Sequence, residues 1–186
     1  MNMRPLFFLA LTCFCGCTGV SIESTLKTRP SGAISGLYIL LRLPTPYYEK
    51  PATLIQALKS NFGIDSDRVA IALIKSDPKG LDLSFETVDN SKFIHQVNAD
   101  AILKIDIVGE STSSSWSQGQ YYVNTTVYMR AKLVNLDETT LFWTSNMALS
   151  GLGDSIDETE AIQIVLALTA EIKKKGIQLS NSGEPK

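Results

Sequence analysis

The amino-terminal leader constrains this chain most, because it determines which residues remain to fold. Residues 1–4 form a short start with one basic residue, and residues 5–14 form an almost entirely apolar run. A run of this length is about half of the roughly 20 residues that a membrane-spanning helix requires. A basic start followed by a short apolar run is the layout of a secretory signal peptide, so we expect the leader to be removed.

The leader ends in a motif that resembles the lipobox of bacterial lipoproteins. Cys17 is preceded by Gly16, and that motif has a small residue before the modified cysteine. Cys13 and Cys15 each follow a larger residue, which suits the signal peptidase less well. The resemblance implies a signal peptide over residues 1–16 and acylation of Cys17. The alternative is an ordinary cleaved signal whose last residues are merely small and apolar.

An acylated cysteine would hold the protein in a membrane without a transmembrane helix. The three acyl chains of such a cysteine exceed the two lipid signals that already give a stable anchor. The residue after Cys17 is Thr18 rather than Asp. By analogy with the sorting rule of enteric bacteria, we expect the outer membrane, with the folded part facing the periplasm.

The mature chain has to fold without disulfides. If Cys17 is its first residue, the other cysteines leave with the leader, and no disulfide or cysteine-based metal site remains. The leader takes 16 of the 186 residues, and the remaining 170 suit one domain with a substantial core. Without Arg4 the chain has 16 basic and 19 acidic residues, a net charge of about −3, so nucleic acid is not an expected partner.

Composition and hydrophobic periodicity divide the mature chain into three parts. Residues 17–35, rich in Ser, Thr and Gly, are expected to be a flexible tether, residues 36–179 a single domain and residues 180–186 a disordered tail. Apolar runs and alternation predict strands, and apolar residues at helical spacing predict helices. The expected strands are residues 37–43, 69–74 (with a helix as the alternative), 101–108, 121–136 and 141–149, and the expected helices are residues 52–62, 91–97 and 155–175. Residues 109–120 are expected to form a polar connection.

The last three strands are expected to form an antiparallel meander. In the first of them Leu103 and Ile105 alternate with Lys104 and Asp106, which predicts one core face and one solvated face. The apolar stripe of the final helix needs a sheet to cover it. We therefore expect the fold class α/β (α+β): a single α/β sandwich, a mixed sheet with a three-stranded antiparallel meander covered by helices that include the carboxy-terminal helix.

Three segments of this region carry a resemblance to known envelope proteins. The strand over residues 99–107, the hairpin around residues 131–137 and the run Leu141 to Trp143 resemble an arrangement found in periplasmic lipoproteins. The group includes a family of bacterial outer-membrane lipoproteins of unknown function, the curli-secretion lipoprotein, the activators of penicillin-binding proteins and the amino-terminal domain of TolB. The resemblance covers residues 88–172 and implies an α/β sandwich of a mixed sheet with helices.

No motif in the sequence supplies a recognisable catalytic or metal site. The only histidine, His95, lies among apolar residues of a short predicted helix, where a structural role is the simpler interpretation. The densest acidic group precedes and opens the final helix, and a helix amino terminus favours acidic residues without any ligand. Its members are Asp154, Asp157, Glu158 and Glu160. We expect no enzymatic activity, no cofactor and no metal.

Aromatic residues in predicted loops and at strand starts are the candidate partner contacts. They are Tyr47, Tyr48, Trp116, Tyr121 and its neighbour Tyr122. Aromatic side chains supply large contact area at protein interfaces. The alternative is that they fold back onto the edge of the core.

An anchor without recognisable chemistry suggests an accessory role. We expect a lipid-anchored periplasmic subunit, without enzymatic activity, that docks on an envelope complex for transport, secretion or cell-wall synthesis. A second hypothesis is a self-assembling outer-membrane export component, in which copies form a ring and residues 110–120 insert in a membrane or channel. A periplasmic ligand-binding module is a third.

Overall fold

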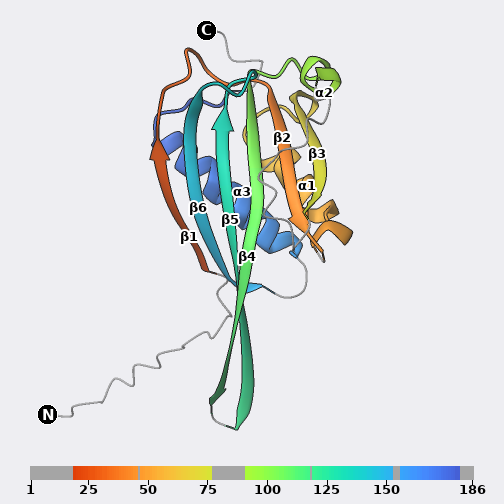
Figure 1. Ribbon diagram of the computed structural model, residues 1–186, viewed down its shortest axis with the longest axis vertical. Helices are drawn as coiled ribbons and strands as arrows, with labels where there is room; N and C mark the ends of the chain where they lie inside the picture. The colour runs from red at the N-terminus through yellow and green to blue at the C-terminus, as the bar shows by residue number, and fades with distance from the viewer. Residues whose placement is uncertain (1–18, 46, 77–90, 118, 153–155, 181–186) are drawn as a thin grey trace, which may run out of the picture.

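A six-stranded mixed sheet is the centre of the structure (Figure 1). The structure is a computed structural model that describes residues 19–45, 47–76, 91–117, 119–152 and 156–180. The strands follow the order β1-β6-β5-β4-β2-β3. β2 is parallel to both β3 and β4. The pairs β4–β5, β5–β6 and β6–β1 are antiparallel. The strands are β1 (Gly19–Leu26), β2 (Leu37–Pro44), β3 (Val69–Ser76), β4 (Ala101–Ser117), β5 (Gln120–Val134) and β6 (Leu141–Leu152).

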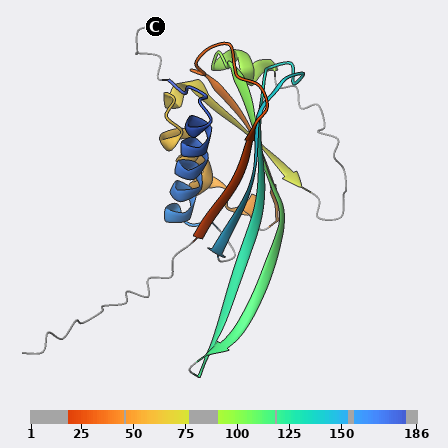
Figure 2. The ribbon, with the colours of Figure 1, turned by 90° about the vertical axis from the view of Figure 1, so that its left-hand side faces the viewer.

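Two helices cover one face of this sheet (Figure 2). They are α1 (Ala52–Asn61) and α3 (Glu158–Lys174), and between them and the sheet lies the main apolar core. Every second residue of β4 from Ala101 to Ile107 points into this core, as the alternating pattern predicts. The mixed sheet, the β4-β5-β6 meander and the covering carboxy-terminal helix confirm the predicted fold class. The segment 69–74, for which a helix was the alternative, is part of strand β3.

The opposite face of the sheet is not simply solvated, which corrects the prediction made from β4. A second apolar cluster lies there, and it includes Tyr38, Leu40 and Ile102 together with residues that follow α2 (Ser91–Gln96). Lys104, expected to be solvated, is only 5% exposed and forms an ion pair with Glu138. Alternation identified the two faces correctly, but it does not show which loops or short helices cover the second face.

The start of α3 is fixed by a capping box between Asp157 and Glu160. The sequence predicted this helix from residue 155, which lies outside the described residues. In the structure the Asp157 carboxylate accepts from the Glu160 N–H at 2.8 Å, and the Glu160 carboxylate accepts from the Asp157 N–H at 2.9 Å. The predicted explanation of the acidic group therefore holds for these two residues, because they satisfy amide groups at the helix start.

Strand β1 corrects the prediction of a flexible tether over residues 17–35. Residues 19–26 pair with β6 along their full length, from Gly19 opposite Ser150 to Leu26 opposite Trp143. Val20, Ile22 and Leu26 are partly buried against the core, Ser24 is partly buried as well, and the alternate residues from Gly19 to Thr25 are exposed. The segment has the period of two that a half-buried strand requires, but its Ser and Thr content hides the pattern.

The folded unit therefore begins well before residue 36. At the carboxy-terminal end of the folded unit, Leu179 pairs with Ile34. The N–H of Ser180, the first residue of the predicted tail, donates to the Ile34 carbonyl at 3.1 Å. The rest of the predicted tail lies outside the described residues, as do the leader and Cys17. None of the helices in the described ranges has the length and apolar character needed to cross a membrane.

A hydrogen bond between strand and helix fastens β1 to the body of the protein. The Ser24 hydroxyl donates to Glu171 Oε1 at 2.8 Å, and this bond is the main reason that the pKa of Glu171 lies below its ordinary value. Lys174 and Lys175 lower it further, against the raising effect of burial. A carboxyl group whose pKa is lower in the folded than in the unfolded state stabilises the fold at pH values above its unfolded-state pKa. This stability is lost as the pH falls through its folded-state pKa.

We predict that Ser24→Ala lowers the free energy of unfolding by about 1 kcal/mol at pH 7, the ordinary net contribution of one hydrogen bond. The difference from the wild type should shrink on acidification below pH 4, because the protonated carboxyl no longer gains from the bond. Urea unfolding at both pH values measures it. Ser21→Ala, at an exposed position of the same strand, is the control. An equal loss in both variants would contradict the assignment.

Candidate functional site

The most distinctive surface is a two-stranded projection formed by the far ends of β4 and β5. β2 pairs with β4 only as far as Asp106, and the pairing of β6 with β5 stops at Thr125. β4 and β5 continue together to the pair Ser117 and Gln120. We call residues 109–117 and 120–125 the hairpin arm. It extends beyond the other strands in both views (Figures 1 and 2).

The hairpin arm corrects the prediction that residues 109–120 form a polar connection. Two local features explain its shape. The register shifts between Ile107 and Gly109, which is a bulge at the root of the arm, and Gly119 has a φ of +77° in the turn at its end. A bulge bends a strand and a glycine permits a positive φ, so the pair can leave the sheet and close on itself.

The two faces of the hairpin arm differ in chemistry. The face that continues the main core carries Trp116, Tyr121 and Val123, all strongly exposed. Trp116 and Tyr121 are direct cross-strand partners, with ring centroids 6.4 Å apart and ring planes at 49°. The other face carries mostly hydroxyl and amide side chains: Ser111, Ser113, Ser115, Ser117, Gln120, Tyr122 and Asn124. The first face also carries Thr112, Ser114 and Thr125, so the exposed apolar residues are gathered at the tip rather than along a whole face.

Beyond Glu110 at its root, the arm has no acidic or basic side chain. Glu110 at its root is the last charged residue before Arg130, and no Asp, Glu, Lys or Arg stands between them. Glu110 is held by the body of the protein, because the Tyr47 hydroxyl donates to its Oε2 at 3.5 Å. Contact of residues 111–117 and 120–125 with an apolar surface would thus remove no charge from water.

The predicted contact residues separate into two groups in the structure. Trp116 and Tyr121 lie together at the exposed tip, with 72% and 62% of their surfaces accessible. Tyr47 is 4% exposed and packs in the main core within η1 (Tyr47–Glu49), so its ring is not available to a partner. Tyr48 is partly buried, with Lys75 Nζ 5.8 Å from its ring centroid. These two follow the alternative interpretation, since they fold back onto the core.

The exposed tip also holds Tyr122, one of the expected contact residues, and Val123, which the sequence analysis did not single out. Tyr122 and Val123 are 47% and 59% exposed, and the Tyr122 hydroxyl donates to Gln120 Oε1 at 2.7 Å. The signal that identifies them is the charge-free run around a glycine turn, rather than any single residue. Cys17, the proposed acylation site, lies outside the described residues.

Charged side chains on the second face of the sheet form ion pairs. Arg42 Nε lies 3.7 Å from Asp106 Oδ1. Burial raises the pKa of the Asp106 carboxyl, and neighbouring cations, Arg42 first among them, oppose that rise. His95 is exposed on α2. Within the described ranges, no three His, Cys, Asp or Glu side chains come together as metal ligands would.

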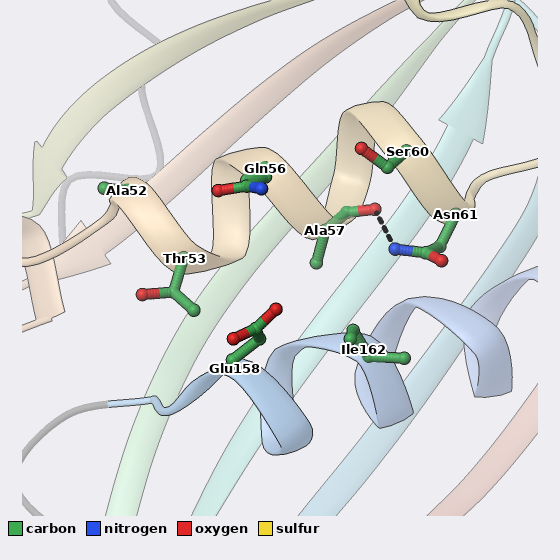
Figure 3. Close-up of a pocket in the computed structure, with 8 residues that line it drawn as sticks. All are labelled: Ala52, Thr53, Gln56, Ala57, Ser60, Asn61, Glu158 and Ile162. Carbon is green, nitrogen blue, oxygen red and sulfur yellow. Dashed lines mark hydrogen bonds between the residues drawn. The ribbon is translucent and has the colours of Figure 1, made fainter.

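A groove between α1 and the start of α3 is a hollow in the described surface that could bear on ligand binding (Figure 3). It has a volume of about 520 Å³ and is lined by small and polar side chains. One of them, the Asn61 amide, donates to the Ala57 carbonyl of its own helix at 3.2 Å. The remaining lining residues are Ala52, Thr53, Gln56, Ser60, Glu158 and Ile162. None is a buried charged group that would select a ligand.

Comparisons with known proteins reach only distant structures. No protein-family model matches the sequence, and no curated protein sequence matches it either. Among solved structures, a PelC dodecamer from Paraburkholderia phytofirmans has 12% identity and a TM-score of 0.46, with 81% of this chain and 94% of that chain covered. Lipoprotein GNA1162 from Neisseria meningitidis has 15% identity and a TM-score of 0.39, covering 75% and 99%.

A third structure, protein XCC0632 from Xanthomonas campestris, has 15% identity and a TM-score of 0.40, with 82% of this chain and 93% of that chain covered. Similarity at this level concerns the broad arrangement of strands and helices. The word lipoprotein and the dodecameric state belong to those proteins, and neither bears on the function of this chain.

Proposed function

We propose that this protein is a lipid-anchored accessory subunit of the bacterial envelope. It has no enzymatic activity of its own and docks on an envelope protein complex through the free edge of its hairpin arm. The acyl chains on Cys17 hold it in the outer membrane, with the domain in the periplasm. The observation that carries the proposal is the length of β4 that extends beyond any neighbouring strand on the side away from β5 in the described structure.

The free edge is suited to strand addition. From Ile107 to Ser117, β4 pairs with β5 on one side, and the described residues supply no strand on the other. Soluble proteins protect such edges with charges, prolines or short strands. The edge over residues 107–117 carries a single charge, Glu110, and no proline. A partner strand would satisfy the open backbone groups and gain affinity from main-chain hydrogen bonds.

The anchor supports a partner at the membrane surface. β1 begins at Gly19, two residues after Cys17, and a fully extended chain spans at most about 7 Å over two residues. A partner that reaches the arm therefore also lies close to the membrane. The residue after the cysteine, Thr18, favours the outer membrane over the inner one.

A second candidate function is a self-assembling export component. The same open edge favours it, because a strand from a second copy would satisfy β4 as well as a strand from another protein does. The two candidates differ in the molecule that lies against β4.

We predict that Cys17→Ser abolishes incorporation of radiolabelled palmitate in cells, because no other residue of the mature chain is an acylation site of this type. Cys15→Ser is the matched control and should leave labelling unchanged, since residue 15 is removed with the leader. Gel autoradiography of the immunoprecipitated protein measures both. Labelling that survives Cys17→Ser would refute the anchor.

We also predict that a photo-crosslinking amino acid at Ser113 on β4 forms an adduct with one identified envelope protein in living cells. The same probe at Lys59, an exposed position on α1, is the control and should not form that adduct. Mass spectrometry identifies the adduct. Equal adducts from both positions, or none from residue 113, would count against docking at the edge, and an adduct of two copies of this chain would favour self-assembly.

A further inference from the structure

The tip of the hairpin arm concentrates exposed apolar surface in a few residues. Eight large hydrophobic side chains are exposed in the described parts of the chain, and four of them lie at this tip. They are Trp116, Tyr121, Tyr122 and Val123. Such a gathering of exposed apolar residues marks an interaction surface more often than single scattered residues do.

The strand register places the tip on the same side of the molecule as the chain's entry into the sheet. Gly19 is opposite Ser150 on β6, and Ser150 is opposite Thr126 on β5. From Thr126 to Gln120 the arm continues for six residues, which at the rise of a β-strand amounts to about 20 Å. Figure 1 shows the arm extending past the start of β1 in this direction.

These two facts conflict with a domain that stands clear of the membrane. An anchor at Cys17 reaches at most about 7 Å from Gly19, whereas the arm extends about 20 Å beyond the level of that residue. If the strands run along the membrane normal, the tip therefore enters the membrane. If the domain tilts toward its arm, the tip lies against the membrane surface. In both orientations the tip and the acyl chains meet the same leaflet.

We propose that the tip of the hairpin arm inserts in the headgroup layer of the membrane that holds the acyl anchor. This inference rests on the proposed function, because it requires acylation at Cys17. Tryptophan and tyrosine prefer this layer, where their rings meet acyl chains and their polar atoms meet water and headgroups. The absence of charged side chains between Glu110 and Arg130 means that insertion buries no ion.

The backbone sets the depth of insertion. Eight residues of β4 from Glu110 to Ser117 are fewer than the 9 to 11 or so of a membrane-spanning strand. No described strand pairs with the outer edges of β4 and β5 in the arm up to Asn124, and unpaired N–H and C=O groups are costly to place in hydrocarbon. The serine-rich face of the arm opposes deep burial as well. A single arm therefore stops at the headgroups, with its rings as a second point of attachment.

Tryptophan fluorescence tests the insertion directly, since the chain has two tryptophans and Trp143 is fully buried in the core. The full acylated protein is reconstituted in vesicles of phosphatidylethanolamine and phosphatidylglycerol that contain lipids brominated at a shallow or a deep acyl position. The Trp116 signal is the difference between the wild type and Trp116→Phe. We expect shallow bromines to quench it at least twofold more than deep bromines.

Two variants provide the matched comparison. Tyr121→Asp places a charge at the tip and should reduce the quenching of Trp116 at least threefold. Leu166→Asp places the same charge at an exposed apolar position on α3 and should leave the quenching unchanged. Trp116 emission that bromolipids do not quench, in protein whose mass shows acylated Cys17, would overturn the inference and leave the anchor intact. A mass without acyl chains would instead overturn the proposed function.

Discussion

The antiparallel pairing of β4 with β5 is the interaction on which the rest of this structure depends. It begins at the pair Ile102 and Val134, where β2 and β6 flank the two strands and α1 and α3 cover one of their faces. It continues to Ser117, where no described strand flanks it. The same ladder of hydrogen bonds therefore joins the buried sheet to the exposed tip. A projection that grows out of a core strand is held in direction by that core, unlike a loop of equal length.

The edge strand β1 fixes where the start of the domain lies relative to the hairpin arm. Its pairing with β6 and the bond from Ser24 to Glu171 hold residues 19–26 on the body of the protein. The start of the domain is thereby fixed near the root of the hairpin arm. In the proposed function, the short link between Cys17 and β1 therefore limits how the domain is oriented at the membrane. That orientation also determines which sheet edge is accessible to a partner.

The sequence predicted the parts of the fold in which apolar residues repeat regularly, namely the alternating core positions of β4, β5 and β6 and the apolar stripe of α3. It missed β1 and the hairpin arm, because Ser and Thr serve equally well in half-exposed strands and in loops, and only pairing partners distant in sequence distinguish the two. Of the aromatic contact candidates, Trp116, Tyr121 and Tyr122 lie at the exposed tip and Tyr47 lies in the core. Aromatic rings suit either place, so local sequence does not decide between them.

Amide hydrogen exchange along β4 tests most directly whether the hairpin arm is a formed ladder with one open edge. In an antiparallel pair of strands, successive residues direct their N–H groups alternately toward the partner and away from it. Measured residue by residue in the isolated protein, exchange over residues 110–117 should alternate between slow and fast, while the flanked residues 102–106 are protected throughout. Fast exchange at every amide from 110 to 117 would show a flexible connection, and would contradict both the ladder and the open edge that a partner strand requires.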